Sequence, residues 1–155
     1  MRKDLPRVVK VLIDTSTFFD VWNAPKHLES VWAQNTLANL LLYQVAHPTL
    51  TVSSFTVFEH LDGLYRQRRE VEAAEFVANV VPTLEVIYPD LQINDLASKI
   101  HAALRVNGKI IGIGDIFIAA SAITANCPLV NANTKHFERI RGLGFPLTIE
   151  NWRDA

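Results

Sequence analysis

The chain has 155 residues, of which 49% are hydrophobic and 20% charged, so it can bury the core of one domain and is not expected to be disordered. Its 15 Lys and Arg against 16 Asp and Glu give a formal net charge of −1, which argues against a protein that coats nucleic acid by bulk positive charge. A single cysteine, Cys127, excludes an internal disulfide framework and a cysteine-rich zinc site.

The first part of the chain predicts one strand and two helices. Apolar, mostly β-branched residues over 8–13 predict a strand buried on both faces, which ends at Asp14. Hydroxyl side chains over 15–17 offer caps for the helix that follows, and Pro25 is expected to end it. Apolar residues near helical spacing predict a long helix over 27–46.

The rest of the chain alternates between short strands and helices. Helices are expected after Ser53, around 93–104 and from Asp115 to about 125, and a charged stretch over 66–75 links or continues the first of them. The remaining strands are predicted over 50–53, 84–87, 128–131 and 146–149. This alternation predicts a single α/β domain over 1–155 with a mostly parallel five-stranded sheet.

Polar side chains at the ends of these elements form the candidate site. Asp14 follows the first strand, and Asn131 and Asn133 follow the fourth. Asp115 opens the helix that leads into the fourth strand, and Glu59 lies in the second turn of the helix after the second strand. Since ligands bind at the carboxyl ends of parallel strands, these side chains are expected to meet at one edge of the sheet.

Each of the three acids also has a purely structural interpretation. Asp14 is suited to cap the first helix, Asp115 to favour a helix dipole, and Glu59 to be a solvated helix residue. The functional interpretation is a Mg²⁺ or Mn²⁺ site, because these cations prefer oxygen ligands and carboxylates packed together without a cation repel one another.

Five segments of the chain resemble those of PIN-domain proteins. Leu12–Ser16 resembles their LLDTN or LLDTS opening, and Ser53–Glu59 their S-x-x-T-x-x-E segment. Gly114–Ala120 resembles G-D-x-x-I-A-A, Leu129–Phe137 resembles L-V-T-x-[DN]-x-x-x-F, and Glu150–Trp152 resembles their E-D-W ending. The set covers nearly the whole chain in order, and it is similar to VapC-type toxins, the ribonucleases of toxin–antitoxin pairs.

The resemblance implies a three-layer α/β/α fold and a ribonuclease that depends on Mg²⁺ or Mn²⁺. It assigns metal binding to Asp14, Glu59 and Asp115, with Glu59 completing the shell or orienting the attacking water. Asn133 matches a fourth catalytic position that is often Asp, so it adds no charge for a second metal. Water would attack the phosphate in line and leave 5′-phosphate and 3′-hydroxyl ends.

The resemblance also implies an RNA substrate, a small antitoxin that covers the site, and a homodimer formed through the N-terminal helices. Candidate substrate-binding residues are Ser16, Asn131, Lys135 and Arg139. Setting aside the three proposed metal-binding acids leaves −1 + 3 = +2 on the rest of the chain, so affinity for RNA is expected from the metal and a local basic strip.

No signal peptide is visible over 1–10, and the longest apolar stretch, over 116–125, is too short to span a bilayer, so a cytoplasmic protein without membrane contact is expected. The five histidines lack zinc-ligand spacing, and His136 is expected to be a surface or capping residue or to face RNA. Trp22 and Trp32 are expected in the core or at a subunit contact.

Three other functions fit parts of the pattern. A degenerate PIN-like binding module is compatible with the neutral Asn133. An aspartate-dependent phosphatase would use Asp14 as nucleophile, but it needs a second Asp where the chain has Ser16. A receiver-type domain would take Asp90 as phosphoacceptor, but the Lys expected after its last strand is missing.

Overall fold

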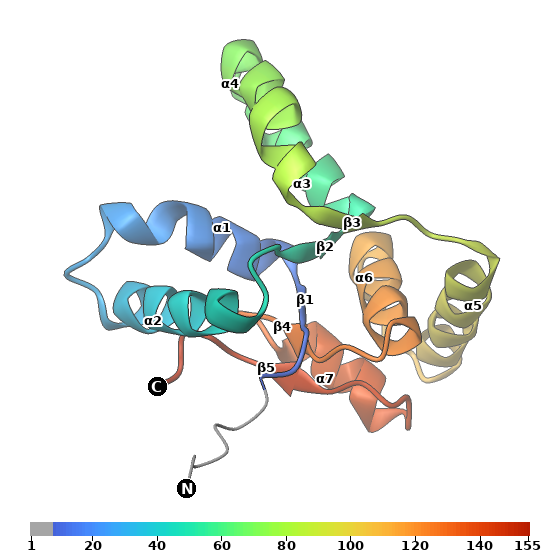
Figure 1. Ribbon diagram of the computed structural model, residues 1–155. Helices are drawn as coiled ribbons and strands as arrows, with labels where there is room; N and C mark the ends of the chain where they lie inside the picture. Colours follow the sequence, from blue (N-terminus) through green and yellow to red (C-terminus); the bar gives the residue numbers. More distant parts are fainter. Residues whose placement is uncertain (1–7) are drawn as a thin grey trace, which may run out of the picture.

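The sheet of the computed structural model, which describes residues 8–155, contains five strands that are all paired in parallel (Figure 1). Their order across the sheet is β3-β2-β1-β4-β5, so β1 lies at the centre. The strands are β1 (Leu12–Ile13), β2 (Thr51–Ser53), β3 (Glu85–Ile87), β4 (Leu129–Val130) and β5 (Ile149–Glu150). The predicted parallel sheet of five strands is therefore confirmed.

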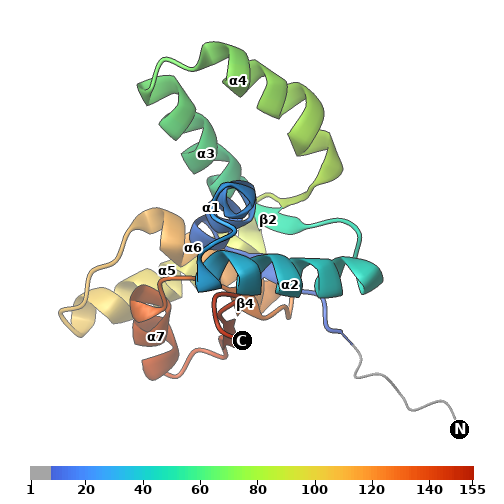
Figure 2. The same cartoon turned by 90° about the vertical axis from the view of Figure 1, so that its left-hand side faces the viewer.

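The strand order explains why helices cover both faces of the sheet. From β1 to β3 the chain moves in one direction across the sheet, and from β3 it crosses back to β4 and continues outward to β5. Because crossover connections are right-handed, a reversal of direction moves the connecting helices to the opposite face. Figures 1 and 2 show α1 (Thr15–Asn23) and α2 (Val31–Ala46) on one side, and α5 (Leu91–Val106), α6 (Ile113–Thr124) and α7 (Lys135–Gly142) on the other.

Two hydrophobic cores fill the space between these layers. Successive residues of a strand point to opposite faces, so Leu12 packs with α5, α6 and α7 while Ile13 packs with α1 and α2. Leu129 and Val130 divide in the same way. All four side chains are fully buried, which is why the short strands read as continuous apolar runs, and the three-layer α/β/α fold is confirmed.

The segment between β2 and β3 extends away from the sheet as a hairpin of helices (Figure 2). It comprises α3 (Ser54–Arg66), α4 (Glu70–Glu75), a π-helical turn (Phe76–Val80) and a 3₁₀ turn (Val81–Thr83). We call residues 54–80 the α3–α4 arm. Leu64 and Phe76 of the arm are buried in the same core as Phe18 of α1, so the arm is anchored beside α1.

Several predicted boundaries differ from the structure. The helix expected over 27–46 begins only at Val31, because Pro25 stands in a 3₁₀ turn (Ala24–Lys26) and a turn follows it. Every strand was expected to begin earlier than it does, since a buried apolar residue next to a strand need not pair with a neighbour, whereas the predicted ends of the first three strands are correct. Asp115 is the third residue of α6 rather than its first, and α7 was not predicted.

The apolar pattern of α2 is only partly used in the core. The helix buries Ala33, Thr36 and Tyr43, whereas Leu41 and Val45 are 66% and 85% exposed. Gly108, which follows the end of α5, has a positive φ of 66°, a backbone conformation that favours glycine. No helix among the described residues is long and apolar enough to cross a membrane. The segment over 1–10, in which no signal peptide was expected, lies mostly outside the described residues, which begin at 8.

Candidate functional site

A pocket of about 290 Å³ opens where the carboxyl ends of β1 and β4 lie side by side. The chain order of the sheet reverses between these two strands, which is where parallel sheets bind ligands. The lining residues are Asp14, Thr15, Ser16, Phe19, Glu59, Asp115, Asn131, Asn133, His136 and Phe137. The structure thus brings together all four predicted catalytic residues, together with Ser16 and Asn131.

Asp14 is the innermost acid of the pocket, with 4% of its surface exposed. It caps α1, because its Oδ2 accepts hydrogen bonds from the backbone N–H of Ser16 (3.3 Å) and from its hydroxyl (2.9 Å). The amide of Asn131 donates to the same oxygen. Oδ1 is buried and has no hydrogen-bond partner among the described residues. The capping interpretation is therefore correct, and it leaves one oxygen available for a ligand.

Ser16 and Asn131 are engaged mainly with Asp14 and with each other. The Ser16 hydroxyl accepts hydrogen bonds from the Asn131 amide (3.2 Å) and from the backbone N–H of Ala132 (3.1 Å). Asn131 is only 1% exposed. These bonds tie the end of β1 to the end of β4, so in this structure the two residues predicted to bind substrate hold Asp14 in place.

Glu59 reaches the pocket from α3 and is half-buried rather than fully solvated. Its Oε1 accepts a hydrogen bond from the Thr15 hydroxyl (3.1 Å), which also bonds the hydroxyl of Thr56 (3.0 Å). The backbone of α6 passes close by, since a Cβ at Gly114 would lie 3.3 Å from Oε1 of Glu59. A glycine at this position lets the helix that carries Asp115 approach the carboxylate.

Asp115 has a partner that the sequence did not reveal. His136, the second residue of α7, donates a hydrogen bond from Nδ1 to Oδ2 of Asp115 at 2.7 Å. A carboxylate only accepts hydrogen bonds, so the proton lies on Nδ1. The two residues are 21 positions apart on different helices, and no spacing in the sequence indicates that they meet.

The charges of the pocket disfavour three ionised acids without a cation. Burial raises the pKa of Asp14, and the negative charge of Asp115 raises it further, while the bonds from Ser16 oppose the shift. Burial also raises the pKa of Glu59, as do the charges of Asp14 and Asp115, against the bond from Thr15. A bound cation would favour the charged forms of both acids.

The pocket fits a hard divalent cation by the chemistry of its donors. It offers carboxylate oxygens, and one of them, Oδ1 of Asp14, is buried without a hydrogen-bond partner among the described residues. The described residues contain no cluster of three or more His, Cys, Asp or Glu close enough to bind a metal directly. The arrangement therefore suits Mg²⁺ or Mn²⁺ held by one or two carboxylates and by water rather than a closed cage.

The predicted basic strip lies outside the pocket. Lys135 and Arg139 are exposed on α7, and neither lines the cavity. Arg139 donates weakly from Nη1 to the carbonyl of Ile110 at 3.5 Å. Asn133 does line the pocket, but its side chain is exposed.

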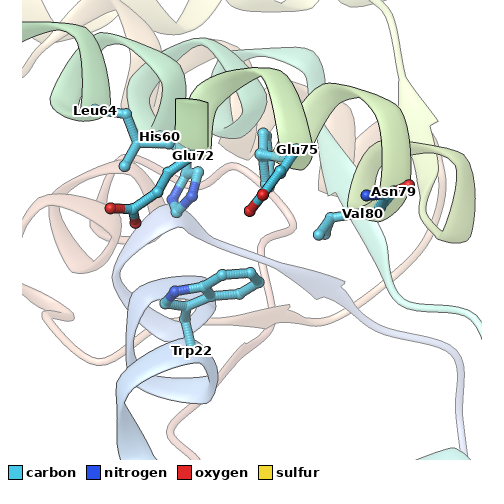
Figure 3. Close-up of a pocket in the computed structure, with 8 residues that line it drawn as sticks. Trp22, His60, Leu64, Glu72, Glu75, Asn79 and Val80 are labelled. Atoms are coloured by element: carbon cyan, nitrogen blue, oxygen red, sulfur yellow. The ribbon is translucent and has the colours of Figure 1, made fainter. Parts of the chain in front are cut away.

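A second pocket of about 200 Å³ separates α1 from the α3–α4 arm (Figure 3). Trp22 of α1 lies opposite side chains of the arm, among them His60, Glu72 and Glu75. Trp22 is 45% exposed, so it is not a core residue, and its expected place at a subunit contact stays a prediction. Burial lowers the pKa of His60, and its Nδ1 has no hydrogen-bond partner among the described residues.

A larger cavity of about 470 Å³ connects the two pockets. It shares Phe19 and Glu59 with the acidic pocket, and Trp22, His60 and Leu64 with the pocket of Figure 3. The three cavities therefore lie next to one another and share side chains of α1 and α3.

The amino-acid sequence of the chain is similar to those of known proteins. The chain matches the PIN domain family over residues 11–143. It is 30% identical over 139 residues to Ribonuclease VapC1 of Methanocaldococcus jannaschii, covering 89% of this chain and 86% of that protein. It is 27% identical over 146 residues to the tRNA(fMet)-specific endonuclease VapC of Salmonella typhimurium, covering 94% and 99%.

The same similarity extends to three dimensions. The structure of VapBC2 from Rickettsia felis, bound to a DNA fragment from the promoter, contains a chain that superposes with a TM-score of 0.70 at 26% identity. The alignment covers 92% of this chain and 98% of that one.

Proposed function

Because this chain belongs to the PIN domain family and VapC proteins are among its relatives, we propose that it is a Mg²⁺- or Mn²⁺-dependent endoribonuclease, the toxin of a type II toxin–antitoxin pair. The observation that carries the proposal is the convergence of three acids from three different helix–strand units on one pocket at the reversal point of the sheet. Relatives that are named ribonucleases support the same activity.

Asp14 and Asp115 are the residues that would hold the cation, and Glu59 would either complete its shell or orient the attacking water. A divalent cation at this place polarises a phosphoryl oxygen and lowers the pKa of a water molecule. Its charge would offset the burial and mutual repulsion that raise the pKa values of Asp14 and Glu59. The unpartnered Oδ1 of Asp14 supports a ligand at this point, since a buried oxygen without a partner destabilises the fold.

Glu59 is the residue suited to act on the attacking water. Thr15 fixes one of its oxygens, which leaves the other to orient the water and to accept its proton. The water oxygen would form the new bond to phosphorus while the P–O3′ bond breaks and O3′ takes up a proton. The products would be 5′-phosphate and 3′-hydroxyl ends.

Binding of the RNA would depend on groups around the pocket rather than on bulk charge. Lys135 and Arg139 lie on the exposed side of α7, near the pocket that Asn133 and His136 line. We assign them contacts to the phosphates on one side of the cleavage point. Ser16 and Asn131 would support the substrate indirectly, through the position of Asp14.

Two surfaces support the proposed protein partners. The exposed Leu41, Leu42 and Val45 of α2 would form the contact between two copies of the chain, in keeping with a dimer through the N-terminal helices. The groove between α1 and the arm would accept the antitoxin, since the cavity next to it shares Phe19 and Glu59 with the acidic pocket. Neighbouring structures that contain both VapB and VapC support an antitoxin partner.

The proposal is tested by incubating the purified chain with cellular RNA in Mg²⁺, Mn²⁺ or EDTA and sequencing the new ends. We expect cleavage with either metal, a loss of at least about 100-fold for Asp14→Asn and for Asp115→Asn, and none for Asp95→Asn. Asp95 is a matched control, because it is an exposed acid on α5 that pairs with Lys99. Undiminished cleavage by both site variants, or full activity in EDTA, would refute the assignment.

The alternatives give different results in the same experiment. A degenerate binding module is favoured by the neutral Asn133 and by the absence of a preformed metal cluster among residues 8–155. Such a module would cut no RNA and would gain no stability from metal. A competent site in Mn²⁺ at about 100 times its Kd should gain about 2.7 kcal/mol of unfolding free energy. A phosphatase would instead turn over small phosphate esters.

A further inference from the structure

The contact between His136 and Asp115 is fixed by the core and not by chance at the surface. His136 is followed by Phe137, and Phe137 and Ile140 of α7 are 1% and 0% exposed. They pack in the same core as Ile116 of α6, the residue that follows Asp115. The two helices therefore carry the imidazole and the carboxylate to a fixed separation, with Nδ1 and Oδ2 2.7 Å apart.

The three acids of the pocket share one arrangement. Each has one oxygen bound by a side chain from another part of the chain: Asn131 binds Asp14, Thr15 binds Glu59, and His136 binds Asp115. In each pair the bond engages a single oxygen and leaves the other for a ligand. A donor of this kind sets the orientation of a carboxylate that binds a metal.

We propose that His136 is a positioning residue that orients Asp115 toward the divalent cation, an inference that rests on the proposed function. The geometry favours Nδ1 as the active atom, because it faces Asp115 directly. The neighbouring Asn133 contributes no charge, so the orientation of the existing acids matters more in this site than it would with a fourth carboxylate. In this role His136 acts through Asp115 and not on the substrate itself.

A purely structural role predicts a different outcome. The His136 side chain is 42% exposed and that of Asp115 is 28% exposed, and ion pairs at such positions change stability by about 0–1 kcal/mol. If the pair served only stability, its loss would slightly lower the melting temperature and leave the metal affinity unchanged. If it positions Asp115, the metal affinity falls about 10- to 100-fold with little change in melting temperature.

The experiment measures the Kd of Mn²⁺ by calorimetry for the metal-free full chain and three variants. His136→Ala removes the donor, whereas His136→Asn retains an N–H near the position of Nδ1. His27→Ala is the control, because His27 is 50% exposed and faces Glu29 at 3.9 Å outside the pocket. We expect a loss of about 10- to 100-fold for His136→Ala, within about threefold of wild type for His136→Asn, and no change for His27→Ala.

Cleavage of RNA provides the second readout. Raising Mn²⁺ should restore activity to His136→Ala but not to Asp115→Asn, because only the second change removes a ligand. The inference is overturned if His136→Ala binds Mn²⁺ like the wild type, or if His136→Asn is as weak as His136→Ala. In either case, loss of binding in Asp115→Asn would leave the proposed function standing. A wild-type chain that neither binds Mn²⁺ nor cuts RNA would overturn both.

Discussion

Replacing Gly114 by alanine should weaken the site without weakening the fold. The added Cβ would lie 3.3 Å from Oε1 of Glu59, so the carboxylate must move by a few tenths of an ångström. Misplacement of a catalytic group by about 1 Å costs about 100-fold in rate, so a shift of this size predicts a loss of about 3- to 10-fold. Alanine is also a better helix former than glycine, by up to about 1 kcal/mol in a helix interior and less at the second residue of α6.

The matched control is the same substitution at Gly63 in α3. A Cβ at Gly63 has nothing within 4 Å, so Gly63→Ala should gain about 0.5–1 kcal/mol of stability and leave cleavage unchanged. Gly114→Ala should stay within about 0.5 kcal/mol of the wild type, because the gain in helix propensity offsets strain on the bond from Thr15 to Glu59. Both variants are compared by urea denaturation and by initial rates of RNA cleavage in Mn²⁺.

Two results would show that this reasoning is wrong. Full cleavage by a stable Gly114→Ala would mean that the position of the Glu59 carboxylate does not limit the reaction. A similar loss of rate in Gly63→Ala would mean that the loss comes from helix stiffness rather than from contact with Glu59. A large loss of stability in Gly114→Ala would instead indicate that α6 and α3 cannot separate by the small distance required.

Three further predictions concern stability and assembly. Arg153→Met should lower the unfolding free energy by about 1–2 kcal/mol in urea denaturation. The side chain of Asp20 is only 9% exposed, and the variant removes the guanidinium that binds both of its oxygens. An unchanged urea midpoint would contradict this prediction. Leu41→Glu should convert a dimer into a folded monomer by light scattering, since Leu41 is 66% exposed and its loss leaves no cavity; a persistent dimer would rule out α2 as the interface. The bond from Lys10 lowers the pKa of Glu85, so the stability that this pair adds is present above the ordinary glutamate pKa of about 4.3 and is lost as pH falls through the lowered value. The difference in unfolding free energy between the wild type and Lys10→Met should therefore shrink over that pH range. A difference that stays constant with pH would exclude the pair as its cause.

The fold could be predicted because its signals are local. Apolar runs such as 8–13 indicated buried strands, and Asp14 and Ser53 do cap the helices that follow them. The lengths of the strands were overestimated, because pairing depends on the neighbouring strand and not on the residues themselves. The helix α7 was not predicted, since only its Phe137 and Ile140 are buried and its other positions are polar.

The candidate site was predicted as a set of positions and not as a set of contacts. The alternation of strands and helices, with polar residues after the strands, was enough to place Asp14, Glu59 and Asp115 at one edge of the sheet. Ser16 and Asn131 were predicted to bind substrate, which stays a prediction, and the structure shows in addition that both bind Asp14. Those bonds depend on side-chain orientation, which the register of β1 against β4 sets.

The sequence by itself determined the layer architecture and the acidic character of the site, because hydrophobic periodicity and helix caps are properties of neighbouring residues. Its net charge of −1 is compatible with an RNA substrate only because three of the acids are gathered in one pocket, and the sequence does not show that they are. Tertiary structure alone decided that His136 meets Asp115 and that Gly114 lies against Glu59. Such pairs form between helices that are far apart along the chain, and only the packing of the core fixes how those helices lie against each other.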